Sequence, residues 1–362
     1  MEIEASKGFA ALLARLGVSL ATTLVPDRLA LIGRDEAGAL AVESAPLAHA
    51  WGLAVSGDRL AVSTLREIIV YANAPRLAPH HPGRPREFDA FFAPRVSFFT
   101  GDAQIHDMAL GRSGLVVANT RFSALCAVDG EYSFKPLWRP PFVSALMPDD
   151  RCHLNGFALE GQRLAYATAF GAFDTPRGWR EHPPQHGVLF DIGGERVLCE
   201  GLCLPHSPRL IDGRLYVTEM GSGKVYEIDR GNGSRRLLAS LPGLTRGLCS
   251  HGGVLFVGLS RPRGSRPDWT LPIDASAGLL RVGIAALDLA SGRLLELLEF
   301  RDPALREVFD VQVLPGIRRA GLTDTMGWDG LFPIDCPESG YWMKFDAASR
   351  SAQQAVPPGD PA

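Results

Sequence analysis

One short pattern occurs five times along this chain, and it constrains the fold more than any other feature. In each copy a first residue is followed nine positions later by a leucine that opens an apolar run, such as Leu60 in LAVST or Leu215 in LYVTE, with a tight turn in between. The first residues of the five copies are Trp51, His106, Asn155, His206 and Arg246. Each copy therefore predicts a strand, a tight turn and a second strand.

The spacing of these copies indicates a β-propeller. Successive first residues lie between 40 positions (206 to 246) and 55 positions (51 to 106) apart, and one hairpin signature in every 40 or so residues is typical of propeller blades. The segment FDVQV predicts a sixth unit with Asp310 in the first position. A chain of 362 residues has room for six or seven four-stranded blades. We therefore predict an all-β fold with a single propeller, and we favour six blades over seven.

The two ends of the chain complete this prediction. Residues 1–17 predict a short N-terminal helix or arm, with Ser6 as a candidate cap. Short strands in LATTLV, DRLALIG and GALAVESA resemble part of a blade, and SGYWMKFDAAS offers another strand near the far end. Because pairing the two ends removes an exposed sheet edge, we expect one blade to contain strands from both. The propeller is then predicted over residues 18–348, followed by a flexible tail at 349–362.

Charge and composition restrict the partners. The formal net charge is −3, which speaks against nucleic acid and anionic lipid as partners. No window reaches the roughly 18 apolar residues of a membrane span, and the acidic start with Arg15 inside the apolar run does not resemble a signal peptide. The six cysteines form no CxxC pair, which favours reduced thiols. We expect a cytoplasmic protein that binds a small molecule or a peptide; the oligomeric state is not predicted.

Loop lengths predict which face carries a site. The turns between the first and second strands are short, whereas longer insertions occur at about 74–93, 139–152, 170–186, 261–278 and 315–338. We predict that all five insertions lie on the face where the first strands begin. Polar side chains beneath long loops on a rigid scaffold are the usual setting of a ligand or active site.

The first residues of the units should form a ring around the propeller axis at this face. The catalytic candidates are His106, Asn155, His206 and Arg246, and the substrate-binding candidates are Trp51, Asp107, His153, Glu219 and Asp310. Two imidazoles and a carboxylate, from His106, His206 and Asp310, could hold a divalent metal ion. A histidine near an arginine equally suits proton abstraction with stabilisation of a developing anion. The alternative is that these side chains only line a water-filled channel.

Two further features leave alternatives open. Trp51 is either a stacking platform for a flat or apolar ligand or a plug in the channel. Arg261, Arg263 and Arg266 in SRPRGSRPDW could attract an anionic substrate, although a solvated basic loop is the more ordinary interpretation. The chain contains no GxSxG elbow, P-loop, GxGxxG after a strand or HExxH. No familiar motif therefore identifies the chemistry.

The segments HDMAL, HLNGFAL, HSPRLIDGRLYVTEMGSGKVYEID and TRGL resemble a family of uncharacterised bacterial proteins, defined only as a domain of unknown function with a propeller fold. The resemblance extends over residues 20–345 and implies no activity. More distantly, the chain is similar to six-bladed propellers such as gluconolactonase, strictosidine synthase, streptogramin lyase and peptidyl amidoglycolate lyase. Calcium sites of the gluconolactonase kind use Glu, Asn and Asp on the ring. Only Asn155 and Asp310 match that set, so the lyases, with His and Arg around a divalent ion, are the nearer analogues.

Two functional hypotheses follow. The first is a lyase, hydrolase or isomerase that acts on a small molecule or modified peptide at the loop-rich mouth, with a divalent metal ion as the cofactor it allows. In it His106 and His206 are bases or metal ligands, Arg246 binds an anionic group, and Asn155 and Asp310 orient or ligate. The second is a non-catalytic propeller that binds a peptide or protein partner through the same face.

Overall fold

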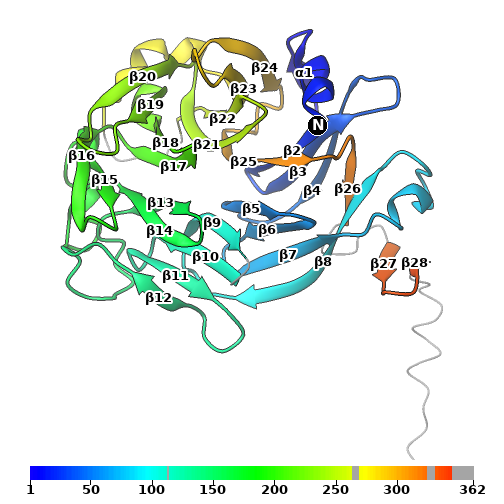
Figure 1. Cartoon of the computed structure of the whole chain (residues 1–362), viewed down its shortest axis with the longest axis horizontal. Coiled ribbons are helices and arrows are strands. Elements are labelled where there is room, and N and C mark those ends of the chain that lie inside the picture. Colours follow the sequence, from blue (N-terminus) through cyan, green and yellow to red (C-terminus); the bar gives the residue numbers. More distant parts are fainter. Residues whose placement is uncertain (112–113, 263–268, 324–330, 345–362) are drawn as a thin grey trace, which may run out of the picture.

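The computed structural model describes residues 1–111, 114–262, 269–323 and 331–344, and it confirms an all-β propeller with six blades (Figure 1). The innermost strands are β5 (Leu53–Ser56), β9 (Ile105–Gly111), β13 (Leu154–Glu160), β17 (Pro205–Ile211), β21 (Leu244–His251) and β25 (Glu307–Pro315). Each of them contacts the innermost strand of the next blade, so together they close a ring around the axis.

The other strands follow outward in antiparallel order in every blade. The second strands are β6 (Arg59–Ser63), β10 (Gly114–Asn119), β14 (Arg163–Ala169), β18 (Arg214–Glu219), β22 (Val254–Ser260) and β2 (Val18–Val25). The third strands are β7 (Glu67–Asn73), β11 (Ala124–Val128), β15 (Gly187–Asp191), β19 (Lys224–Ile228), β23 (Gly283–Asp288) and β3 (Arg28–Arg34). The outer strands are β8 (Ala90–Phe99), β12 (Lys135–Trp138), β16 (Arg196–Leu202), β20 (Arg235–Ser240), β24 (Leu294–Phe300) and β4 (Leu40–Pro46).

The repeated sequence pattern forms the first hairpin of each blade. In β17–β18 the pair Ile211 and Arg214 flanks a two-residue turn, and both turn residues, Asp212 (φ 49°) and Gly213 (φ 77°), have left-handed backbones. An Asp-Gly turn of this kind matches the twist of the two strands. Four of the five leucines that follow the turns are buried, namely Leu60, Leu115, Leu215 and Leu255, and Leu164 is partly buried. The core accordingly lies between neighbouring blades.

The predicted closure by the two chain ends is confirmed. The closing blade has the order β25-β2-β3-β4, with Thr22 opposite Val311. Its C-terminal strand is β25, however, and not the segment SGYWMKFDAAS. That segment contributes β28 (Gly340–Lys344), which pairs with β27 (Leu331–Asp335) in a hairpin outside the ring (Figure 1). The hairpin is attached through Trp342, whose Nε1–H donates to the Leu77 carbonyl at 3.0 Å.

The N-terminal arm contains one strand and the expected short helix. Strand β1 (Ile3–Ala5) pairs with β24 and extends that blade to five strands. Helix α1 (Phe9–Leu16) packs its buried side chains Phe9, Leu12 and Leu13 into the cluster between the β21–β24 blade and the closing blade. Ser6 is not the helix cap: Gly8 occupies that position, and the Ser6 hydroxyl accepts from the Leu297 backbone N–H at 2.9 Å. The predicted tail at 349–362 lies outside the described residues.

Three of the five long insertions lie on the predicted face, and two do not. The loop after β7 joins the third strand to the fourth, so it lies at the opposite end of the axis and holds the 3₁₀ turn η1 (Ala78–His80). The chain after β25 also starts from that end, where β26 (Ala320–Leu322) pairs in parallel with the beginning of β8. The prediction was wrong for 74–93 because it counted that segment among the connections from a second strand to a third or from one blade to the next, whereas it joins a third strand to a fourth.

Two of the remaining insertions carry short 3₁₀ turns. The insertion at 170–186 holds η2 (Gly178–Arg180) and η3 (Pro184–His186), and the insertion after β22 holds η5 (Pro272–Leu279). A further 3₁₀ turn, η4 (Met220–Ser222), lies in the short connection between β18 and β19. Across the described ranges, the model contains no helix long and apolar enough to cross a membrane.

Candidate functional site

A cavity of about 360 Å³ opens at the end of the axis where the first strands begin. Its wall uses two positions of the repeat. The ring position contributes Trp51, His106, His206, Arg246 and Phe309, and the position two residues earlier contributes Gln104, His153, Leu204, Leu244 and Glu307. The wall of the cavity is therefore formed by residues at the start of the innermost strands of several blades rather than by one loop.

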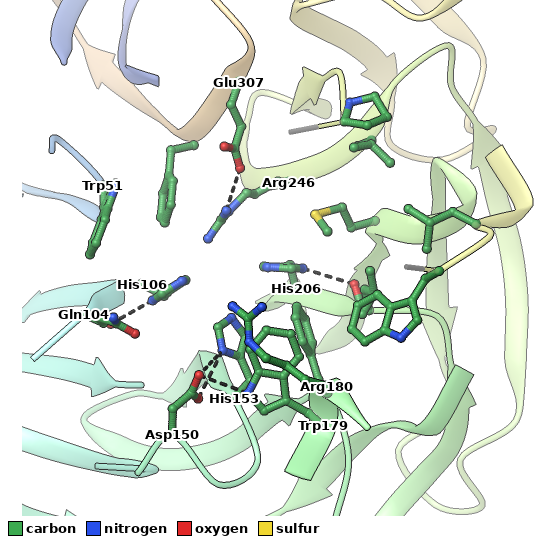
Figure 2. Close-up of a pocket in the computed structure, with 18 of the residues that line it drawn as sticks. Trp51, Gln104, His106, Asp150, His153, Trp179, Arg180, His206, Arg246 and Glu307 are labelled. Carbon is green, nitrogen blue, oxygen red and sulfur yellow. Dashed lines mark hydrogen bonds and ion pairs between the residues drawn. The ribbon is translucent and has the colours of Figure 1, made fainter. Parts of the chain in front are cut away.

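The backbone conformation at the earlier position explains how residues of the two positions come together. Gln104 (φ 50°), His153 (φ 52°) and Leu204 (φ 54°) all have left-handed conformations, which non-glycine residues rarely adopt. The carbonyls of Gln104 and Leu204 accept from Nδ1 of the imidazoles two residues later, His106 at 2.7 Å and His206 at 3.1 Å. This local turn holds each ring histidine by one nitrogen, and both imidazoles project into the cavity (Figure 2).

His106 is held as a neutral imidazole. Its Nδ1 lies 2.7 Å from the Gln104 carbonyl and 2.9 Å from the Thr120 hydroxyl, which itself donates to the Leu154 carbonyl at 2.6 Å. The proton therefore belongs on Nδ1, and Nε2 carries the lone pair. Burial lowers the pKa of His106 well below 6.5, and the charges of His153 and Arg246 lower it further. The imidazole can accept a proton or a hydrogen bond at neutral pH.

His153 forms a dyad with a carboxylate. Its Nδ1 lies 3.0 and 3.1 Å from the two oxygens of Asp150, and the same carboxylate accepts from Trp179 Nε1–H at 3.0 Å. The His153 ring is packed against Trp179, with centroids 4.4 Å apart, and meets the His106 ring edge-on at 5.0 Å. An aspartate behind a histidine fixes its tautomer and the orientation of its ring. The two imidazoles thus form a pair with different partners.

Arg246 is the buried cation of the cavity. It donates to Glu307 Oε1 at 2.7 Å, and its guanidinium lies 3.3 Å from the centroid of the Phe309 ring (Figure 2). Trp51 stacks on Phe309 at 5.9 Å with an interplanar angle of 14°. The guanidinium plane is therefore set by an aromatic stack, an arrangement that suits arginine better than lysine.

Further arginines surround the mouth. Arg121 enters from the loop after β10, Arg177 and Arg180 from the insertion after β14, and Arg261 from the insertion after β22. Arg180 lies over the ring of Trp179, 4.5 Å from its centroid. The cavity combines these cations with aromatic walls and two carboxylates. Such a lining suits a small organic anion.

Comparison with known proteins identifies the family. The model of the family described as "Domain of unknown function (DUF4915)" matches residues 7–322. The chain belongs to this family. A search of the curated proteins gives no match.

Among solved structures, a chain of a nidogen/laminin complex is similar to this DUF4915 protein at a TM-score of 0.53 and 13% identity, covering 83% of this chain and 99% of that one. A protein of unknown function from Bacteroides caccae has a TM-score of 0.46 and 10% identity, over the same shares of the two chains. The first likeness shows the propeller fold alone.

Two of the predicted substrate-binding residues lie elsewhere in this DUF4915 propeller. Asp310 accepts from the backbone N–H groups of Val311 at 2.8 Å and Leu53 at 3.1 Å, and Asp107 accepts from Phe157 N–H at 3.1 Å. Each carboxylate binds the next blade at the residue two positions after that blade's ring residue. Asp107 and Asp310 therefore occupy equivalent positions in their blades. The sixth ring residue is consequently Phe309, and the prediction of Asp310 was wrong by one position. Burial raises the pKa of Asp310 to about 7, against the opposing charge of Arg209.

Asn155 and Glu219 are buried but do not line the cavity. The Asn155 side-chain oxygen accepts from the Thr168 hydroxyl at 2.8 Å. Glu219 accepts from the Cys203 backbone N–H at 3.0 Å. His153, two residues before Asn155, faces the cavity in its place. The predicted catalytic role of Asn155 and the substrate-binding role of Glu219 therefore have no geometric support.

The three predicted metal ligands do not converge. His106 and His206 line the cavity, but the Asp310 carboxylate is bound to backbone N–H groups below it. Within the ranges that the model describes, no group of three or more His, Cys, Asp and Glu side chains is placed to hold a metal ion. We assign no residue of this chain to a metal.

The sequence pattern does not indicate Glu307, Phe309, Asp150 or Trp179 as residues of the cavity. Glu307 and Phe309 were hidden by the one-residue error at Asp310. Asp150 and Trp179 lie in insertions, where no repeat indicates orientation. Of these, only Asp150 leaves a usable signal, because it lies three residues before His153. Arg261 lines the mouth, whereas Arg263 and Arg266 lie outside the described residues.

Proposed function

We propose that the cavity binds a small organic acid and that His106 removes a proton from the carbon next to the acidic group, as in a lyase or isomerase. The observation that carries this proposal is the neutral His106 imidazole, with its Nε2 lone pair toward the same space as the buried Arg246 (Figure 2). Arginine beside a base that is unprotonated at neutral pH is a common basis for such chemistry.

The proposed proton transfer needs only the substrate and side chains of this cavity. The C–H bond breaks, its proton passes to His106 Nε2, and its electron pair moves onto the substrate's acidic group as an enolate-like anion. Arg246 donates hydrogen bonds to that anion, and Phe309 and Glu307 keep the guanidinium in place. His153, paired with Asp150, is placed to return a proton at another atom of the substrate. Elimination or return of the proton then gives lyase or isomerase products.

Ligand binding would also strengthen the base. Burial and the neighbouring positive charge of Arg246 lower the pKa of His106 in the empty cavity. A bound carboxylate offsets that charge and raises the pKa of the imidazole. The base is thus weak until the substrate is in place.

Solvent isotope exchange tests the proposal without knowledge of the overall reaction. A panel of carboxylic acids is incubated with the protein in deuterated water, and loss of the proton next to the carboxylate is followed by NMR. We expect exchange with the parent protein, and a fall of at least about 100-fold in His106→Gln with binding retained. His251→Gln, at the end of β21 and at the other end of the molecule's axis, is the matched control and should exchange normally.

The outcome also separates the two functional hypotheses. Binding of acids without exchange in the parent would contradict the catalytic proposal and favour a propeller that only binds. No binding of any acid in the panel would contradict the proposal of an organic-acid site.

A further inference from the structure

We propose that the ligand carries two acidic groups, one bound at Arg246 inside the cavity and a second bound by Arg177 and Arg180 at its mouth. This inference rests on the proposed function, because it takes the inner acidic group as given. It adds a substrate class: small diacids, either dicarboxylates or phosphocarboxylates.

The charge at the cavity is opposite to that of the whole chain. The protein has a formal net charge of −3, yet five arginines line this one cavity against two carboxylates. Both carboxylates already have partners there: Glu307 accepts from Arg246, and Asp150 accepts from His153 and Trp179. Arg121 is paired with Asp102 outside the cavity. The other four arginines still bring more positive charge to the lining than one carboxylate of a ligand would neutralise.

The mouth arginines are separated from the inner one by depth. Arg246 is only 5% exposed, whereas Arg177 and Arg180 are exposed to solvent. All three line the same cavity. A ligand that extends from the floor to the mouth thus meets one cation at each end, and a volume of about 360 Å³ falls in the range of small-molecule sites.

Arg180 is held in position, unlike an ordinary surface arginine. Its guanidinium lies on the face of Trp179, and Trp179 is anchored in turn by the hydrogen bond from Nε1–H to Asp150. Trp179 is itself buried. A guanidinium that is already stacked loses less conformational entropy when it binds an anion.

Nearby acids are engaged by a different arginine. Asp149 and Asp174 both pair with Arg151, at 3.2 and 2.7 Å. Among the described residues no ion pair is found for Arg177 or Arg180. Their charges are consequently available for an acid that the protein itself does not supply.

Matched probes and variants test this inference by calorimetry. The probes are linear dicarboxylates from succinate to pimelate, the monoamide of each, and the phosphonocarboxylate analogues. The variants are Arg177→Gln/Arg180→Gln and the control Arg59→Gln, whose arginine lies exposed in the β5–β6 hairpin at the other end of the axis. Thermal unfolding of each variant first confirms that it is folded.

For the best dicarboxylate we expect the double variant to bind about tenfold more weakly, while the affinity for its monoamide and the behaviour of Arg59→Gln stay unchanged. A tighter phosphonocarboxylate would identify phosphate as the outer group, and a tighter dicarboxylate would identify carboxylate. Equal affinity of diacid and monoamide in the parent, or an equal loss for both in the double variant, would overturn the inference and leave the proposed function standing. Failure of the parent to bind any of these acids would overturn both.

Discussion

Two arginines of neighbouring blades have opposite surroundings. Arg209 makes two bonds to Asp107, at 2.8 and 2.9 Å, and donates to the carbonyls of Phe157, Pro208 and Leu248. It thus connects four successive blades across the axis. Arg246 pairs with Glu307 from the next strand and stacks on an aromatic ring at the wall of an open cavity.

The difference indicates separate roles for the two arginines. All the nitrogens of the Arg209 guanidinium bond to groups of the protein, and this residue lies toward a second cavity of about 230 Å³ at the other end of the axis. Arg246 is instead oriented by the Phe309 ring face and by Glu307 at the wall of an open cavity. We therefore assign Arg209 to the architecture and propose that Arg246 binds the ligand.

Removing the structural arginine should have the largest effect. Arg209→Met leaves Asp107 buried without its cation, and we expect a loss of about 3–5 kcal/mol in the free energy of unfolding. Equilibrium denaturation with urea measures it. Asp107→Asn, which leaves the partly buried Arg209 without its carboxylate, should also be destabilised. A change below about 1 kcal/mol in both variants would remove the distinction drawn here.

Substitution of Arg246 should affect ligand affinity more than stability. We expect Arg246→Met to lower the affinity for carboxylate probes by about tenfold to 100-fold, because a hydrogen bond to a charged group is lost. The unfolding free energy should fall less than in Arg209→Met, because Glu307 borders an open cavity and can be hydrated. Calorimetric titration and denaturation of the same samples give both numbers. Unchanged affinity with a large loss of stability would make Arg246 a second structural arginine.

The neutral His106 predicts a pH dependence of stability. Its pKa in the folded protein lies below 6.5, so between the two values the unfolded chain binds more protons, and stability falls on acidification through about pH 6.5. The slope is at most about 1.4 kcal/mol per pH unit from this group. We expect a shallower slope in His106→Gln than in the parent or in the His251→Gln control. Identical slopes in all three would show that His106 is not neutral by burial.

The smallest effect on the unfolding free energy is expected at Trp179, in the insertion after β14. Trp179→Phe keeps the ring beneath Arg180 but removes the hydrogen bond to Asp150, at a cost of about 1 kcal/mol in unfolding free energy. Because Arg180 is then less firmly held, the preference for diacids over monoamides should weaken slightly. Trp269→Phe, at the same cavity, is the control. An effect as large as that of Arg209→Met would place Trp179 among the structural residues.

The sequence predicts the architecture well because strand, turn and strand recur with a regular offset. The six blades, the short helix and the closure by both chain ends all follow from local patterns that the model confirms. The errors arise where one blade departs from the pattern. Asp310 occupies the position of Asp107 and not that of His106, and a one-residue shift in a strand turns every side chain to the other face.

The site is only partly predictable from the sequence for the same reason. Ring residues such as His106, His206 and Arg246 face the cavity because the repeat fixes their direction. Asp150 and Trp179 come from insertions, whose course depends on tertiary contacts rather than on a period. The left-handed turns that bring His153 into the wall leave no composition signal, because they occur at Gln, His and Leu alike.

The most direct test of the central claim, that the ring end binds an organic acid beside a neutral histidine, is proton uptake on binding. A carboxylate probe is titrated calorimetrically at about pH 6 in buffers of different ionisation enthalpy, with the parent and with His106→Gln. We predict net uptake of protons by the parent, because the bound anion raises the pKa of His106, and reduced uptake by the variant. Binding with no proton uptake, or with equal uptake in His106→Gln, would contradict the account.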